Sequence, residues 1–290
     1  MNHLRINILR NRMKPSFFIF LLLIPTIVFS QISNDGALKV KAKPDGNIIK
    51  VTMMLKNKMI GDRKTWVSRK NMKADFVTHI TTYIKNKIVF DISMSPLMSS
   101  YPLIKYKIKD IKKANSIECV VTDINNKKEE YSFAIKRRNN LIKSSEQPKV
   151  LNKNYGIDYR RTKPKAWEVA SIQESISELY GSVASPIQGK INLSAPKFAD
   201  CTSRVPINIS TNIDLESFAI LTDEMPYSTV AVVSIPAGTI IDYNFKIKIN
   251  PNCKTTRSIV VFGKSRDGSF HKTAINNIKV ACADDCGGGG

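Results

Sequence analysis

Alternating apolar and polar positions dominate the first half of the chain, between residues 40 and 136. Segments rich in Val, Ile, Thr and aromatic residues follow this two-residue period, which is typical of half-buried β-strands. They lie at 47–55, 75–84, 87–94, 103–109, 116–124 and 130–136. The pairs Asn86-Lys87 and Asn125-Asn126 stand where turns are expected. Six short strands without a convincing helix predict a small β-sandwich.

The second half begins with a helical pattern and then returns to strands. Apolar residues first recur at the spacing of one helix face: Val169, Ile172, Ile176, Leu179 and Tyr180. Gly181 follows them, which favours the end of a helix there. Strand-like segments then lie at 189–195, 205–211, 217–224, 228–235, 240–249, 256–265 and 277–283. With a hairpin turn at Asp267-Gly268, this predicts a second β-sandwich led by one short helix.

The segment between the two halves, residues 139–165, is polar and basic and contains two prolines, which predicts an interdomain linker. We therefore expect an all-β chain with a first sandwich at 31–138 and a second at 166–281. A signal peptide at 1–30 precedes them, and a short arm at 282–290 follows.

The N-terminus has the pattern of a secretion signal. Basic residues precede the apolar run at 16–29: Arg5, Arg10, Arg12 and Lys14. The run is shorter than the roughly 20 residues that span a bilayer, and Pro25 interrupts it, so an integral membrane protein is not expected. A cleavage site before Gln31 and the absence of a twin-arginine pair favour export by general secretion. An uncleaved anchor helix is the alternative.

The positive charge is unevenly distributed. The chain has a formal net charge of +21, and residues 31–140 hold 23 Lys+Arg against 10 Asp+Glu, whereas residues 166–290 hold 11 against 12. Such a surface suits acidic partners or anionic lipids. Nucleic acid is not an expected partner of an exported protein. A compositional bias shared with Ile and Asn would also explain the lysines.

The C-terminal arm carries the most informative residue, Cys286. Only glycines follow it, so nothing later in the chain can cover the thiol, and glycine makes the arm mobile. A thiol on such an arm can accept a sulfur group and release it by exchange. Asp284 and Asp285 disfavour the thiolate because like charges repel, so a partner must activate it. This favours a carrier over a catalyst, and we predict no catalytic residue. A frayed tail and a Cys282–Cys286 disulfide are the alternatives.

The remaining cysteines and histidines suggest no second active centre. Cys201 and Cys253 both lie beside predicted strands and form either a disulfide or free thiols, whereas Cys119 fits a core position. His79 and His271 have no partners at ligand spacing, so neither a metal nor a cofactor is expected. A nucleophilic pair of Cys286 and His271 would require a pinned tail.

Several longer motifs resemble a known family. "AWEVASIQESISELYG", "GKINLSAPKFA", "VPINI" and "DGSFHKTAINNIKVACADDCGGGG" resemble the Y subunit of the periplasmic sulfur-oxidation carrier SoxYZ. "NKMIGDRK", "DFVTHITTYIKNKIVFDISM" and "MSSYPLIKYKIK" resemble its Z subunit. The resemblance implies two immunoglobulin-like sandwiches in tandem, with a Z-like half fused ahead of a Y-like half.

The resemblance also implies a function. The family's carrier cysteine lies in a Gly-Gly-Cys-Gly-Gly tail, so Cys286 takes the covalent sulfur group and Gly287 and Gly288 are the flexible residues after it. Asp284 and Asp285 replace the preceding glycines, and Cys282 is a second thiol. The implied partners are a c-type cytochrome enzyme that attaches thiosulfate, a manganese-dependent sulfate thiohydrolase and, where present, a sulfane dehydrogenase.

Two other classes of function stay open at this point. One is a binding or delivery module whose tail cysteine is a disulfide handle. The other is an exported thiol–disulfide oxidoreductase that uses Cys282 and Cys286.

Overall fold

The structure is a computed structural model of the 290-residue chain. It describes residues 38–56, 59–60, 74–111, 114–137, 156–181, 185–199, 204–223, 227–249 and 257–280. The strands of the first half are β1 (Leu38–Asp45), β2 (Ile48–Leu55), β3 (Val77–Ile84), β4 (Lys87–Met94), β5 (Leu103–Lys109), β6 (Ser116–Asp123) and β7 (Lys128–Ala134).

The second half starts with three short helical elements, α1 (Tyr159–Thr162), the 3-10 helix η1 (Pro164–Trp167) and α2 (Ile172–Tyr180). Its strands are β8 (Ile187–Gln188), β9 (Asn192–Ser194), β10 (Phe198–Ala199), β11 (Val205–Thr211), β12 (Leu215–Thr222), β13 (Thr229–Ser234), β14 (Ile241–Ile247), β15 (Arg257–Ser265) and β16 (Phe270–Val280). Among the described residues, no helix has the length and apolar character needed to cross a bilayer.

These elements confirm the prediction of an all-β chain with two sandwiches in tandem. The differences are local. β1 was not among the predicted strands, β16 begins at Phe270 instead of 277, and α1 was not expected. The turn between β3 and β4 uses Lys85 and Asn86, both at positive φ, one residue earlier than predicted. The domain boundaries stay a prediction, because the signal peptide and the arm lie outside the described residues.

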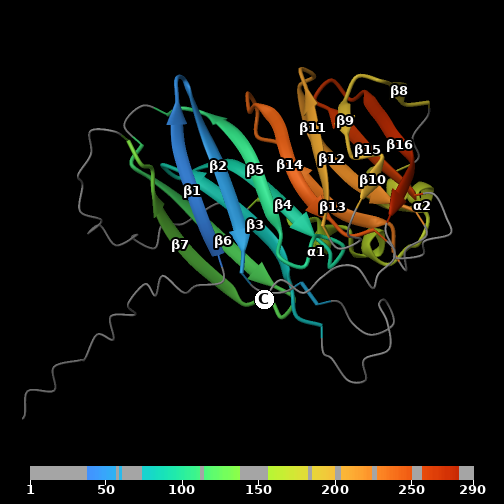
Figure 1. Ribbon diagram of the computed structural model, residues 1–290, viewed down its shortest axis with the longest axis horizontal. Helices are drawn as coiled ribbons and strands as arrows, with labels where there is room; N and C mark the ends of the chain where they lie inside the picture. Colours follow the sequence, from blue (N-terminus) through green and yellow to red (C-terminus); the bar gives the residue numbers. More distant parts are fainter. Residues whose placement is uncertain are drawn as a thin grey trace, which may run out of the picture. The chain divides into compact units, whose positions relative to one another are not determined.

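The strands form two sheets, and each sheet contains strands of both halves (Figure 1). One has the order β1-β2-β5-β14-β11-β9, and the other has the order β10-β16-β15-β12-β13-β4-β3-β6-β7, with β8 beside β16. The halves meet where β5 pairs with β14 and β4 pairs with β13, both antiparallel. We call these two strand pairs the seam. The separate sandwiches that the sequence predicts are therefore joined edge to edge.

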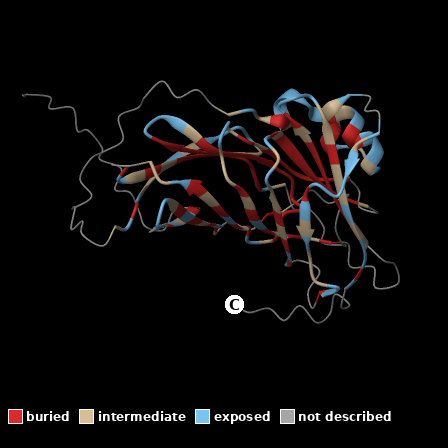
Figure 2. Cartoon of the chain, turned by 90° about the horizontal axis from the view of Figure 1, so that it is seen from above, coloured by how far each residue is buried: buried red, intermediate tan, exposed pale blue. Residues whose placement is uncertain are grey.

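Aromatic side chains fill the space between the sheets at the seam. Phe90 of β4 stacks on Tyr106 of β5 with ring centroids 4.3 Å apart, and it lies 5.8 Å from Tyr243 of β14. Tyr243 in turn lies 5.7 Å from Phe218 of β12. All four side chains are buried, and burial raises the pKa of Tyr106 and Tyr243. They belong to one apolar cluster that extends through both halves, seen as the buried strand residues in Figure 2.

The helical elements cover the outer face of the ten-stranded sheet in the second half. Ser171 caps α2 by accepting a hydrogen bond from the Glu174 amide at 3.0 Å, and Gly181, at φ +82°, ends the helix as predicted. Trp167, Ile176 and Leu179 are buried against residues of β12, β13 and β15: Ala219, Leu221, Val232, Val260 and Phe262. The predicted apolar stripe from Ile172 to Tyr180 is therefore the packing face of α2, whereas Val169 of that stripe precedes the helix.

A second contact between the halves lies at the described end of the predicted linker. The carboxylate of Asp91 in β4 accepts a hydrogen bond from the Ile157 amide at 2.9 Å, and Ser93 Oγ accepts one from the Tyr159 amide at 2.9 Å. The Arg160 guanidinium lies over the rings of Phe76, at 5.2 Å, and Trp167, at 4.9 Å. We call residues 156–160 the clamp, because they attach the start of the second half to the first.

Gly156 in the clamp has no room for a side chain. A Cβ atom at this position would lie 2.0–2.3 Å from the carboxylate atoms of Asp91. This close approach allows Asp91 to receive hydrogen bonds from the clamp on one side and from Thr81 Oγ1, at 2.8 Å, on the other. Only glycine permits this packing.

Removing the aromatic contact at the seam tests whether the halves unfold together. We expect Phe90→Ala to lower the unfolding free energy by about 3–5 kcal/mol, since it leaves a cavity between β4, β5 and β14. Guanidinium denaturation should show one cooperative transition at lower denaturant concentration. Tyr101→Ala, at a side chain that is 54% exposed, is the control and should change the free energy by less than about 0.5 kcal/mol. Two separate transitions, with only one of them shifted, would contradict a shared core.

The clamp gives a second prediction. Gly156→Ala should destabilise the protein by about 1–3 kcal/mol, because the new methyl group collides with the Asp91 carboxylate. In the Asp91→Ala background the same glycine substitution should cost much less, since the colliding group is gone. A double-mutant cycle in thermal or chemical unfolding measures this coupling. Additive effects of the two substitutions would show that the collision does not decide the stability.

Candidate functional site

The C-terminal strand leads from a tight hairpin to the predicted cysteine arm. The hairpin turn at Asp267-Gly268 is confirmed, with Gly268 at φ +88°. Asp267 Oδ1 accepts hydrogen bonds from the amide and the hydroxyl of Ser269, at 2.8 and 2.7 Å. These bonds lower the pKa of Asp267, so the turn is held by an ionised carboxylate at neutral pH. β16 then pairs antiparallel with β15.

A bulge redirects the last residues of β16. Ile275 opposes Ile259 and Ile278 opposes Arg257, so Asn276 and Asn277 together face a single residue of β15. Asn277 has φ +65°, a left-handed conformation that asparagine tolerates better than most residues. After the bulge, the Ile278 side chain is fully buried. The bulge therefore turns an apolar side chain into the core just before the strand ends.

A short parallel strand holds the end of β16 from its other side. In β10, Phe198 pairs with Lys279 and Ala199 pairs with Val280. The Lys279 amide also donates a hydrogen bond to the carbonyl of Lys197, at 3.0 Å. We call residues 276–280 the root of the arm. Ile278 is buried and pairs with Arg257 of β15, and Lys279 and Val280 pair with β10, so the root is a fixed end for the chain that follows.

The arm itself lies outside the described residues. This holds for the predicted attachment residue Cys286, the second thiol Cys282, and the flanking residues Asp284, Asp285, Gly287 and Gly288. It also holds for Cys201 and Cys253, so their disulfide stays a prediction. Cys119, by contrast, is fully buried in β6, as predicted, and its Sγ atom lies 3.8 Å from Thr82 Oγ1.

Of the three histidines in the chain, His79 and His271 are among the described residues, and they lie in β3 and β16. No group of three His, Cys, Asp or Glu side chains among the described residues could hold a metal ion. His271 Nε2 lies 3.0 Å from the Ser269 hydroxyl. His79 Nε2 lies 2.8 Å from Asp91 Oδ1, and both side chains are at least nine-tenths buried. The closeness of His79 and Asp91 was not predicted from the sequence, since it depends on the antiparallel pairing of β3 with β4.

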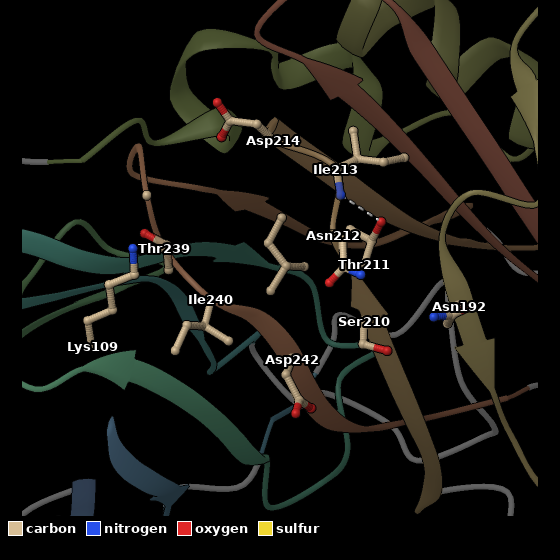
Figure 3. Close-up of a pocket in the computed structure, with 12 residues that line it drawn as sticks. Lys109, Asn192, Ser210, Thr211, Asn212, Ile213, Asp214, Thr239, Ile240 and Asp242 are labelled. Atoms are coloured by element: carbon tan, nitrogen blue, oxygen red, sulfur yellow. Dashed lines mark hydrogen bonds between the residues drawn. The ribbon is translucent and has the colours of Figure 1, made fainter. Parts of the chain in front are cut away.

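Two of the hollows on the described surface are large and open. One, of about 550 Å³, is lined by Lys109 of β5 and by residues around the ends of β11 and β14, among them Thr211, Asp214 and Asp242 (Figure 3). Within it the Ile213 amide donates to Thr211 Oγ1 at 3.1 Å. The other, of about 660 Å³, has His79 and the two arginines of α1 in its lining. The described lining of both contains hydroxyl, amide and charged groups and no thiol.

Models of two protein families match the chain. Residues 38–134 match the sulphur oxidation protein SoxZ, and residues 176–283 match the sulfur oxidation protein SoxY. Together the two matches cover more than half of the chain, and they confirm the resemblance that the motifs indicate. No curated protein sequence matches the chain.

Solved structures give weaker likenesses. The sulfur carrier protein SoxY from Chlorobium limicola f thiosulfatophilum is 20% identical at a TM-score of 0.33, over 38% of this chain and 96% of that one. A superoxide reductase (neelaredoxin) from Ignicoccus hospitalis is 14% identical at a TM-score of 0.27, over 32% of this chain and 81% of that one. The N-terminal periplasmic domain of ScsB from Proteus mirabilis is 11% identical at a TM-score of 0.20, over 83% of this chain and 93% of that one. TM-scores this low carry no argument.

The root of the arm lies inside the SoxY match, and the strands β1 to β7 make up the SoxZ match. The chain therefore belongs to the SoxZ and SoxY families of sulfur-oxidation proteins, with a SoxZ domain fused ahead of a SoxY domain in one polypeptide.

Proposed function

We propose that this protein is a periplasmic carrier of thiosulfate oxidation that holds sulfur intermediates covalently on Cys286, while separate enzymes carry out the chemistry. The observation that supports this most directly is the fixed end of β16 in the SoxY domain, six residues before Cys286. The secretion signal in the sequence supports the periplasmic location.

The distance from the root to the thiol defines the working range of the arm. Six residues at about 3.3–3.6 Å each span at most roughly 20 Å from Val280 to Cys286. That length reaches into an active-site cleft of a docked enzyme. Because Ile278 pairs with β15 and Lys279 and Val280 pair with β10, only the residues after Val280 have to move.

The buried thiol of the first half is poorly placed to carry cargo. Cys119 is fully buried between the sheets, where a bound thiosulfate group would have to displace core side chains. A carrier thiol must be reached by several enzymes in turn, so it has to lie on the surface. The C-terminal position of Cys286 meets this requirement.

The attachment of thiosulfate to Cys286 and its later removal conserve atoms and electrons. The outer sulfur of thiosulfate forms a disulfide bond with Sγ of Cys286, the thiol loses its proton, and two electrons pass to the c-type cytochrome enzyme. Water then cleaves the bond between the bound sulfane sulfur and the sulfonate group at the manganese-dependent thiohydrolase, which releases sulfate and leaves a persulfide on Cys286. A sulfane dehydrogenase, where present, oxidises that remaining sulfur. In this scheme the protein itself supplies the thiol and the positioning.

Intact-mass analysis of protein purified from its own periplasm tests this function. We expect thiosulfate-sized or sulfane-sized adducts on the wild-type chain and none on Cys286→Ser. Cys282→Ser is the matched control, and its adducts should persist. An intramolecular disulfide between Cys282 and Cys286, two hydrogens lighter and without adducts, would favour a thiol–disulfide oxidoreductase instead.

The root gives a prediction of its own. Asn277→Val places a β-branched side chain at φ +65°, which should cost about 1–2 kcal/mol and loosen the end of β16. Hydrogen exchange of the Lys279 amide should then be faster than in the wild type, whereas Asn277→Gly should leave it protected. Asn276→Val changes the exposed neighbour in the same way and is the control. Equal acceleration in both valine variants would mean that the bulge conformation does not hold the root.

A further inference from the structure

Lysines cover the outer face of the SoxZ part of the six-stranded sheet. β1, β2 and β5 carry seven lysines and one acidic residue, Asp45. We call the seven the lysine face: Lys39, Lys41, Lys43, Lys50, Lys105, Lys107 and Lys109. Each alternates with an inward-facing residue of the core, and Figure 1 shows the three strands side by side. One face of this part of the sheet is therefore apolar, and lysine is the most frequent residue on the other.

The register places these charges next to one another. Lys43 of β1 is directly opposite Lys50 of β2, which is directly opposite Lys107 of β5. In the next row Lys41 and Lys105 flank Thr52. Like charges directly opposite on neighbouring strands are destabilising, since the side chains lie only about 5 Å apart. The stability of the fold therefore does not account for the lysine face.

A general richness in lysine does not account for it either. The other strands of the same half, β3, β4, β6 and β7, carry two lysines against five acidic residues. On the SoxY side of the six-stranded sheet, β9, β11 and β14 carry one lysine and one aspartate. The positive charge is concentrated on one face of one half.

Most of the lysine face is free to act on a partner. Lys50 lies 2.5 Å from Asp45, and Lys107 pairs with Asp242 of β14. Lys50 first, and Lys107 more weakly, lower the pKa of Asp45. Within the part of the chain that the structure describes, the other five lysines make no ion pair: Lys39, Lys41, Lys43, Lys105 and Lys109.

We propose that the lysine face is a docking surface for a folded protein that presents a patch of carboxylates, namely an enzyme that acts on the arm. A rigid sheet with lysines in rows matches a rigid acidic surface and raises the association rate by electrostatic steering. A lipid surface fits less well, because on these strands the large apolar side chain exposed for insertion is Met54 alone, at 36%. The identity of the partner rests on the proposed function.

Association rates test the docking surface. The chain is used with Cys286→Ser, so that no sulfur is loaded, and the probes are the c-type cytochrome enzyme and the thiohydrolase of the same organism. With at least one of them, Lys41→Glu combined with Lys105→Glu should lower the association rate constant at low ionic strength about tenfold or more, and should flatten its salt dependence. The melting temperature should not fall, since the substitutions relieve repulsion.

A matched pair of substitutions on the other sheet controls for the change in net charge. Lys87→Glu with Lys272→Glu makes the same change in total charge in β4 and β16 and should alter the rate less than about twofold. Equal losses in both pairs, or no loss with either enzyme, would overturn the proposal. So would binding to phosphatidylglycerol vesicles through Lys41 and Lys105 without binding to the enzymes. Intact docking together with a lack of sulfur on wild-type Cys286 would refute the proposed function alone.

Discussion

The backbone pairing at the seam is the constraint on which the rest of this structure depends. Without their partners, β4 and β13 would each leave a row of amide and carbonyl groups unpaired at a sheet edge, beside a large apolar core. Pairing them satisfies those groups and also encloses Phe90 and Tyr243 between the sheets. The core of each half is therefore completed by strands of the other half, and residues far apart in sequence become mutually dependent.

The fold was largely predictable from the sequence, because the local alternation of apolar and polar residues determines where strands form. β4, β5 and β11 begin and end where the alternation predicts, and Gly181 and Gly268 end α2 and turn the last hairpin as expected. β1 was missed because Pro44 and its three lysines weaken the signal. The seam could not be predicted, since nothing in the period of β4 reveals which distant strand lies beside it.

The site was predictable only in part, for a related reason. The carrier role of Cys286 stays a prediction from the sequence. The sequence does not reveal that Asn277 bends β16 or that β10 holds its end, because both depend on pairing between distant segments. The close pair of His79 and Asp91 is also a product of hairpin register and of burial beneath the clamp. The lysines were visible as a charge surplus, whereas their collection on one face required the register of three strands.

Covalent fusion adds to the seam a second, independent means of keeping the halves together. A tether holds one half at a high effective concentration near the other, so pairing no longer depends on protein concentration. The clamp makes this tether more than a passive link, because Ile157 and Tyr159 bond directly to β4, the same strand that pairs with β13. Where the polypeptide enters the second half, it is thus held on β4, one of the strands of the seam. The edges of β4 and β13, which would otherwise be open to pairing with other chains, cover one another within the same polypeptide.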